Sequence, residues 1–171
     1  SNEIISGSED DTIKIWNLEN GKFIREIQVQ TLNIKTLAVS SNGILISGIE
    51  TLRQNIGLWN METGEILGNL SGHLNSIESL VITKKDVLIS GSVDKTIKIW
   101  DIEKGECIKT LRGHTDSVTS LAVGPNEDEL ISGSYDKTIR IWNLISGECT
   151  KILKEHTSWI TALLSHRNGN I

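Results

Sequence analysis

Short alternations of apolar and polar residues, with a period of two, run along the chain. In TIKIWD (96–101) apolar side chains occupy every second position and several are β-branched, which is typical of a half-buried strand. DVLISGS (86–92) and SVTSLAV (117–123) are largely apolar runs bounded by turn residues, as in strands buried on both faces. ECIKTL (106–111) is more polar. No segment shows a helical period, so the pattern predicts a succession of short strands.

One phrase recurs at a fixed interval. SGSVDKTIKIWD (90–101) is nearly repeated as SGSEDDTIKIWN from Ser6 and as SGSYDKTIRIWN from Ser132. Four tryptophans are spaced by 43, 41 and 42 residues: Trp16, Trp59, Trp100 and Trp142. A glycine follows each of them five residues later and predicts a tight turn with a positive φ angle. A period of this length indicates an array of repeated units.

Each unit is expected to contain four antiparallel strands. In the third unit these are 76–83, 86–92, 96–101 and 106–111, and in the fourth 117–123, 129–134, 138–143 and 148–153. A single four-stranded sheet of this length cannot bury both of its faces, so the sheets must stack on one another. Stacking around a common axis gives a β-propeller. The predicted fold is an all-β propeller of four-stranded antiparallel blades. We expect residues 1–171 to form one domain, with blades at 1–29 plus 155–171, 30–71, 72–112 and 113–154.

At this point the chain resembles the WD-repeat β-propellers over essentially its whole length. The Gly-His pair of that family is matched at Gly72-His73 and Gly113-His114, and its Trp-Asp pair at Trp100-Asp101. The other units have asparagine after the tryptophan: Asn17, Asn60 and Asn143. The period, the Gly-His pair, the SGS-x-D phrase and the Trp-Asp/Asn pair together make a specific signal.

The resemblance implies a buried hydrogen-bond chain of His, Ser, Asp and Trp in each blade. It maps onto two full sets in this sequence: His73, Ser90, Asp94 and Trp100, then His114, Ser132, Asp136 and Trp142. The donors and acceptors match, because an indole N–H only donates, a carboxylate only accepts, and imidazole and hydroxyl do both. Such a chain is tolerated in a core only when every member is satisfied.

A further blade is divided between the two ends of the sequence. NEIISGS (2–8) has the pattern of a second strand, whereas EHTSWITALLS (155–165) has that of an inner strand. Three arrangements stay open: a homodimer that closes an eight-bladed ring by strand exchange, a fragment of a larger propeller, and a self-closed four-bladed monomer. In the dimer, His156 would complete the set of Ser6, Asp10 and Trp16 across the subunit boundary.

The repeated Ser, His and Asp residues also permit a hydrolase triad, but an enzyme needs one active site and this set recurs in register with a tryptophan. A zinc site is disfavoured because the histidines fall one per unit, with no cysteine or carboxylate at ligand spacing. No glycine-rich phosphate loop precedes a helix. We therefore expect no catalytic residue, no metal and no cofactor.

The second unit departs from the pattern. QTLNIKTLAV (30–39) lacks the Gly-His pair, and 12 residues separate Ser47 from Trp59 where the other units have 10. We expect this blade to lack the buried chain and its loop 50–55 to project further. Two explanations are compatible with this change: neutral sequence drift in a loop that tolerates insertions, or a loop that sets specificity for a partner.

The family resemblance places partner contacts on the rim, at the starts of inner strands and before the turn aspartates. The candidate residues are Glu9, Lys35, Glu78, Thr119, Tyr135, Trp159 and Thr161. Trp159 stands where the third and fourth units have serine, and exposed Trp and Tyr are frequent interface hot spots. The alternative for Trp159 is packing into the core between blades.

Composition narrows the class of partner. The formal net charge of −5 and pI near 5.4 disfavour nucleic acid and anionic membranes, and no apolar run is long enough to span a bilayer. Cys107 and Cys149 occupy matching repeat positions, so we expect two free thiols and an intracellular, cytoplasmic protein. The leading function is a non-catalytic scaffold for a protein or peptide, as part of a larger protein or complex. The alternatives are a structural repeat array without a specific partner, and an enzyme or small-ligand sensor that uses the central channel.

Overall fold

The computed structural model describes residues 2–29, 33–49 and 56–166. In these residues the chain forms four antiparallel sheets, numbered here one to four in chain order. Sheet one contains β1 (Glu3–Gly7), β2 (Thr12–Asn17) and β3 (Phe23–Gln28). Sheet two contains β4 (Ile34–Val39), β5 (Ile44–Ile49), β6 (Ile56–Asn60) and β7 (Ile66–Leu70). Sheet three contains β8 (Ile77–Ile82), β9 (Leu88–Ser92), β10 (Ile97–Asp101) and β11 (Glu106–Leu111). Sheet four contains β12 (Val118–Val123), β13 (Glu129–Ser134), β14 (Ile139–Asn143) and β15 (Cys149–Leu153).

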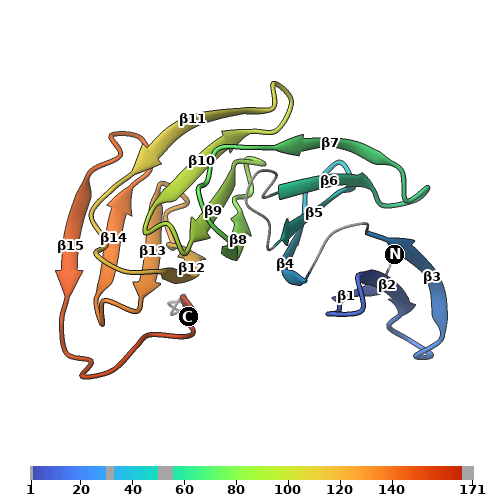
Figure 1. Ribbon diagram of the computed structural model, residues 1–171, viewed down its shortest axis with the longest axis horizontal. Coiled ribbons are helices and arrows are strands. Elements are labelled where there is room, and N and C mark those ends of the chain that lie inside the picture. The colour runs from blue at the N-terminus through green and yellow to red at the C-terminus, as the bar shows by residue number, and fades with distance from the viewer. Residues whose placement is uncertain (1, 30–32, 50–55, 167–171) are drawn as a thin grey trace, which may run out of the picture.

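The sheets lie along an open arc, with β4, β8 and β12 on its inner side and β3, β7, β11 and β15 on its outer side (Figure 1). Within each sheet, strands pair in chain order with their sequence neighbours, which is the simplest result of short hairpins. The all-β prediction is confirmed, and so are the strand positions predicted for the third and fourth units. Sheet one has three strands, because no inner strand pairs with β1 in the described chain.

The turns between the third and fourth strands explain why asparagine can replace the aspartate that follows tryptophan. The Oδ1 of Asn143 accepts hydrogen bonds from the amides of Ile145 and Ser146, while Asp101 Oδ1 accepts one from Lys104. An amide oxygen thus serves this turn as well as a carboxylate. The following glycines, such as Gly105 (φ 70°) and Gly147 (φ 82°), have the left-handed conformation that closes the turn.

Three apolar clusters join neighbouring sheets and form the core. The cluster between sheets three and four is representative: Ile89, Ile97, Ile99 and Leu111 from one sheet pack on Val118, Leu121, Leu130 and Trp142 from the next. The same kinds of residue recur between sheets one and two and between sheets two and three. The core therefore lies between the sheets, as radial stacking requires.

A glycine in the second strand allows each close approach between sheets. A Cβ on Gly91 would lie 2.8 Å from Val118 Cγ1, and one on Gly48 would lie 2.8 Å from Ile77 Cγ2. A Cβ on Gly7 would meet Ile34 in the same way. The glycine of the repeated SGS phrase is therefore required by packing, since a methyl group would push the next sheet away.

Residues 154–166 contain no strand, in contrast to the inner strand predicted from the sequence. They nevertheless lie beside β12: Leu163 N donates to Ser120 Oγ (2.8 Å) and Ser165 Oγ donates to the carbonyl of Val123 (2.7 Å). Ile160 packs on Gly133 as Val118 packs on Gly91. The segment has the position of an inner strand but no ladder, because no strand of the described residues pairs with it.

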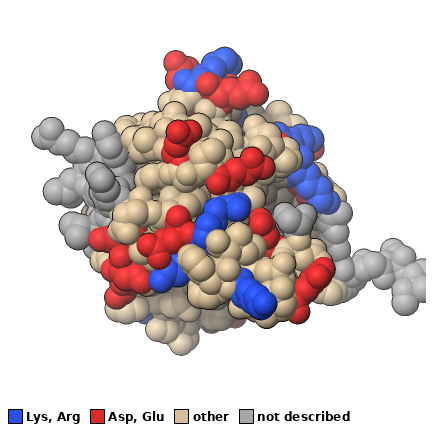
Figure 2. Space-filling view, turned by 90° about the vertical axis from the view of Figure 1, so that its right-hand side faces the viewer, with Lys and Arg blue, Asp and Glu red and all other residues tan. Residues whose placement is uncertain are grey.

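The side of the molecule at the right of Figure 1 carries acidic and basic side chains in small interspersed groups (Figure 2). Uncharged surface separates these groups, and neither sign forms one continuous area on that face.

Candidate functional site

A chain of hydrogen bonds runs through the interior of sheet three. Trp100 Nε1 donates to Ser90 Oγ (2.8 Å), and this hydroxyl lies 2.8 Å from His73 Nε2. The other ring nitrogen, His73 Nδ1, lies 2.8 Å from Asp94 Oδ2. Because a carboxylate only accepts, Nδ1 carries the proton and Nε2 accepts the hydroxyl proton of Ser90. Every member of the chain is thereby satisfied.

Sheet four contains the same arrangement. Trp142 Nε1 donates to Ser132 Oγ (2.8 Å), and His114 lies 2.8 Å from Ser132 through Nε2 and 2.7 Å from Asp136 through Nδ1. Both serines are fully buried. Their hydroxyls accept from an indole and donate to an imidazole, so they are structural groups rather than accessible nucleophiles.

A threonine that the sequence analysis missed extends each network. Thr96 Oγ1 donates to Asp94 Oδ1 (2.6 Å), and Thr138 Oγ1 donates to Asp136 Oδ1 (2.6 Å). The backbone amides of Leu74 and Thr115 donate to the second carboxylate oxygen. The signal for these threonines was the D-x-T triplet, which recurs at 10–12, 94–96 and 136–138.

These contacts set the charge states of the network. Burial opposes ionisation of Asp136, but hydrogen bonds from Thr138, His114 and the amide of Thr115 outweigh it and hold the carboxyl pKa far below its usual value of 3.8. Burial lowers the pKa of His114 below 6.5, although its hydrogen bond to Asp136 opposes this shift. At neutral pH the network therefore contains a carboxylate and a neutral imidazole.

A family model of the WD domain, G-beta repeat, matches residues 1–17, 64–101 and 105–143. The chain belongs to the WD40 repeat family. Such repeats generally mediate protein interactions and are generally non-catalytic. No curated protein matches the chain. In the described residues, no helix is long and apolar enough to cross a membrane. The four sheets are called blades one to four from here on.

The WD40 network of blade one is incomplete. Trp16 Nε1 donates to Ser6 Oγ (2.9 Å) and Thr12 Oγ1 donates to Asp10 Oδ1 (2.6 Å), but no histidine bonds to either residue in the described chain. The hydrogen bond from Thr12 lowers the pKa of Asp10, whose side chain is 55% exposed. His156, which was expected to complete this set only across the boundary of a strand-exchanged dimer, is exposed near the other end of the chain.

Blade two retains half of the network. Trp59 Nε1 donates to Ser47 Oγ (2.9 Å) although 12 residues separate them, so the prediction that this blade lacks the buried chain is wrong for its Ser–Trp link. Gly57 lies beside this contact, and a Cβ there would lie 2.7 Å from the indole nitrogen. The loop 50–55, which was expected to project further and for which both drift and a specificity role were left open, lies outside the described residues.

Two aromatic residues meet on the rim. The rings of Tyr135 and Trp159 stack with centroids 4.7 Å apart and planes 22° apart, and Trp159 is 62% exposed. The neighbouring Ile160 is the residue that packs between the sheets, so Trp159 lies outside the core between blades. Tyr135 N donates to the carbonyl of Ser117, which fixes the turn that carries the ring.

The other predicted rim residues differ in their exposure to solvent. Glu9, Lys35 and Thr161 are exposed, whereas Glu78 is half-buried. The hydroxyl of Thr119 bonds internally to the carbonyls of Gly133 and Ile160. The Thr119 hydroxyl thus links blade four to the segment that carries Trp159, and it helps to hold the aromatic pair in place.

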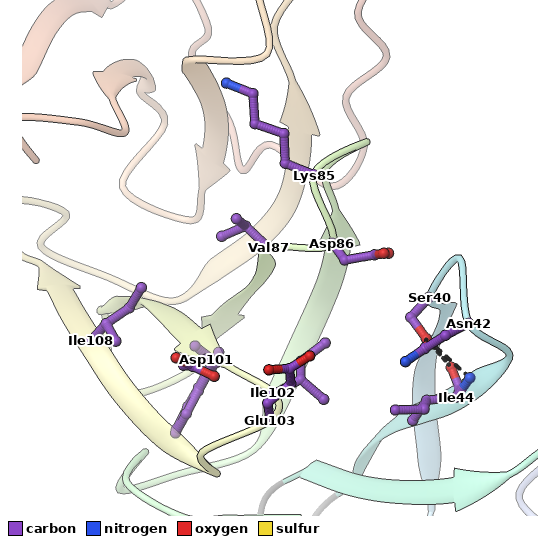
Figure 3. Close-up of a pocket in the computed structure, with 11 residues that line it drawn as sticks. Ser40, Asn42, Ile44, Lys85, Asp86, Val87, Asp101, Ile102, Glu103 and Ile108 are labelled. Atoms are coloured by element: carbon purple, nitrogen blue, oxygen red, sulfur yellow. Dashed lines mark hydrogen bonds between the residues drawn. The ribbon is translucent and has the colours of Figure 1, made fainter.

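A cavity of about 280 Å³ lies on the opposite face, between the first turns of blades two and three (Figure 3). The sequence analysis did not foresee it. It is lined by Ser40, Asn42, Ile44, Lys85, Asp86, Val87, Trp100, Asp101, Ile102, Glu103 and Ile108. In Figure 3, Asp86 extends toward the turn of Ser40 and Asn42, and its carboxylate accepts hydrogen bonds from the amide and hydroxyl of Ser41.

Several polar groups of this cavity are engaged in hydrogen bonds or ion pairs. Asp86 holds the turn of blade two, Asp101 pairs with Lys104 (3.0 Å) and Lys85 pairs with Asp128 (3.2 Å). In the described residues no group of His, Cys, Asp and Glu could hold a metal ion. Contacts at the cavity therefore join neighbouring blades.

Proposed function

We propose that this WD40 domain is a non-catalytic scaffold that binds a protein or peptide through the rim around Trp159 and Tyr135. The stacked aromatic pair supports this proposal. An indole that is 62% exposed is unusual in a chain whose other tryptophans bond to serines inside the sheets. Aromatic side chains that are rigid and exposed are typical anchors of interfaces.

The pair is held in place before a partner arrives. Tyr135 stands on a hydrogen-bonded turn and Trp159 is adjacent to the buried Ile160, whose amide donates to the carbonyl of Ser134. Because little side-chain freedom is lost on binding, a preformed pair supplies contact area at a low entropic cost. Exposed Thr161 and Lys35 are the rim residues that we propose as polar contacts.

An enzymatic role is disfavoured by the geometry of the Ser–His–Asp sets. Ser90 and Ser132 are fully buried and each accepts an indole N–H, so no substrate carbonyl can reach either oxygen. We further propose an intracellular, cytoplasmic location, which the two free cysteines support.

Selection of a displayed peptide library on the folded domain tests the rim proposal. We expect Trp159→Ala to abolish capture of the selected peptides while the circular dichroism spectrum stays unchanged, because Trp159 lies outside the core. Tyr135→Ala is expected to weaken capture, since it removes the ring on which Trp159 stacks.

Leu74→Ala is the matched control, because Leu74 is an exposed apolar residue elsewhere on the same rim. Its capture should equal that of the unmodified domain. Peptides that bind the Trp159→Ala domain with unchanged affinity would contradict the proposal. A library from which no peptide is enriched would favour a structural repeat array.

A further inference from the structure

Two neighbouring cavities on the face opposite Trp159 have the same construction. The first, of about 280 Å³, lies between blades two and three, and the second, of about 190 Å³, lies between blades three and four. Each is bordered by the first turns of two adjacent blades and by the turn between the third and fourth strands of the later blade. Both are lined by Lys85, Val87 and Ile108, so the two cavities share a wall.

The first turns of adjacent blades are joined at both cavities. Ser41 N donates to Asp86 Oδ1 (2.8 Å) between blades two and three, and Lys84 N donates to Glu127 Oε2 (3.1 Å) between blades three and four. Ser41 and Lys84 have the same place in their repeats, so the same bond recurs from one pair of blades to the next. The walls of both cavities are therefore fixed before a partner binds.

An exposed isoleucine stands at the second cavity, where the other blades have an acidic residue. Ile145 is 74% exposed, and its repeat equivalents are Glu19, Glu62 and Glu103. The amide of Ile145 donates to Asn143 Oδ1 (2.9 Å), and its carbonyl accepts a hydrogen bond from Lys109 Nζ of blade three (2.6 Å). The turn thus holds an apolar side chain in solvent at a fixed position.

The second cavity is mainly apolar. Its apolar lining comes from two blades and consists of Val87, Ile99, Ile108, Leu144 and Ile145. Ile108 is 59% exposed, so blades three and four each contribute an isoleucine that solvent reaches. A preformed apolar cavity favours an aliphatic side chain of a partner, because binding removes apolar surface from water without the cost of ordering the walls.

Carboxylates outnumber lysines in the lining of the two cavities. The acidic residues are Asp86, Asp101 and Glu103 at the first cavity and Glu127 and Asp128 at the second. Among the described residues that line the cavities, Lys85 is the only basic one. In Figure 3, Lys85 extends away from Asp101 and Glu103, and it pairs with Asp128 of blade four (3.2 Å).

The first cavity keeps its negative charge at neutral pH. Hydrogen bonds from Ser41 lower the pKa of Asp86, and hydrogen bonds from Lys104 lower the pKa of Asp101. Lys104 also forms an ion pair with Asp101 (3.0 Å), whereas Glu103 is exposed and has no ion pair among the described residues. Glu103 is therefore the carboxylate that a partner's lysine or arginine can reach.

We propose that the two cavities form one docking groove for a segment of a partner protein that combines an aliphatic side chain with lysine or arginine. The aliphatic side chain enters the second cavity beside Ile108 and Ile145, and the basic side chain meets Glu103 at the first. Nucleic acid and anionic lipid are disfavoured, because the lining has five carboxylates and one lysine. The groove lies on the face opposite Trp159, so this site is independent of the rim.

Selection from two displayed peptide libraries is the first test. Both libraries present a leucine or isoleucine, which is flanked by lysine and arginine in one library and by aspartate and glutamate in the other. They are screened on the folded Trp159→Ala domain, so the rim does not contribute. We expect peptides to be enriched from the basic library only, with an affinity that falls as salt is raised, because salt screens charge pairs at an exposed surface.

Two substitutions in the groove test the assigned contacts. Ile145→Glu introduces the residue of the other repeats and should weaken binding of the enriched peptides about tenfold or more, because it removes an apolar anchor. Glu103→Lys should also weaken binding, since it places a like charge beside the basic side chain. Both side chains are exposed, so the circular dichroism spectrum should not change.

Matched controls make the same changes of chemistry away from the groove. Leu74→Glu alters an exposed leucine on the opposite rim, and Glu62→Lys alters the exposed equivalent of Glu103 in blade two. Both variants should bind the enriched peptides with unchanged affinity. Amide chemical shifts of the isotope-labelled Trp159→Ala domain locate the peptide without a substitution in the groove: those of Glu103 and Ile145 should move, and that of Tyr135 should not.

Four results would overturn the proposal. These are no enrichment from either library, equal enrichment from the acidic library, binding that neither Ile145→Glu nor Glu103→Lys weakens, and shift changes at Tyr135 in place of Ile145. Because the selection uses a domain without Trp159, failure of the groove and failure of the rim proposal are separate results.

Discussion

Ser132 shows how one hydroxyl organises a whole blade. It accepts the indole N–H of Trp142 and donates to His114, so the ring of the histidine can face the carboxylate of Asp136. Each group satisfies the next, and removal of any one leaves a buried polar atom without a partner. At the residue scale, these networks contribute to stability and to the position of the rim turns.

His114→Ala is expected to lower the free energy of unfolding by about 1–3 kcal/mol, because Ser132 and Asp136 both lose a buried partner. Urea denaturation measures this change. His166→Ala changes an exposed histidine and should have little effect. Equal unfolding midpoints for the two variants would show that the network does not stabilise the blade.

Stability should fall as the pH drops below about 6.5 because of the same histidine. The pKa of His114 is lowered from 6.5 by burial, so the unfolded chain takes up a proton at a higher pH than the folded chain does. The contribution is complete above pH 6.5 and is lost as the pH falls toward the folded pKa. We expect a smaller drop in the urea midpoint for His114→Gln; an identical drop would assign the pH dependence to other groups.

Each blade has an irregularity in strand pairing at its tryptophan. The register between the third and fourth strands shifts at Trp16, Trp59, Trp100 and Trp142. Such a bulge increases the local twist, and a twisted blade packs with its neighbours around a ring. At the element scale, a glycine in the second strand then admits the Ile or Val of the next inner strand.

Gly91→Ala is expected to destabilise the domain by about 1–3 kcal/mol, because the new methyl group would lie 2.8 Å from Val118 Cγ1. Thermal unfolding measures the effect, and Gly68→Ala is the control, since no atom lies within 4 Å of its Cβ position. Val118→Ala in the same chain should offset part of the loss. Additive effects of the two substitutions would mean that this contact does not couple the blades.

The whole molecule is an open arc. The apolar side chains at the three interfaces between blades are almost completely buried. The equivalent side chains on the uncovered faces of blades one and four, such as Ile4 and Leu153, are exposed.

Much of the fold could be predicted because its signals are local. Alternation and the 41–43-residue spacing of tryptophan predicted the strands, and the resemblance to the WD-repeat family implied which His, Ser, Asp and Trp side chains meet. Thr96 and Thr138 were missed although their D-x-T pattern was present. The Ser47–Trp59 bond was missed because residue counting cannot show that a longer loop leaves both strand ends in register.

The sequence by itself determined the repeat, the strand pattern and the residue types of each blade, because a period of two and turn glycines act within a few residues. Only the tertiary structure decided which apolar side chains are covered. Leu111 and Leu153 have the same place in their repeats, yet one is buried and the other is 45% exposed, because burial depends on whether a neighbouring blade is present. The stacking of Tyr135 on Trp159 and the cavity beside Asp86 likewise arise from residues of different repeats, which meet only when the blades pack.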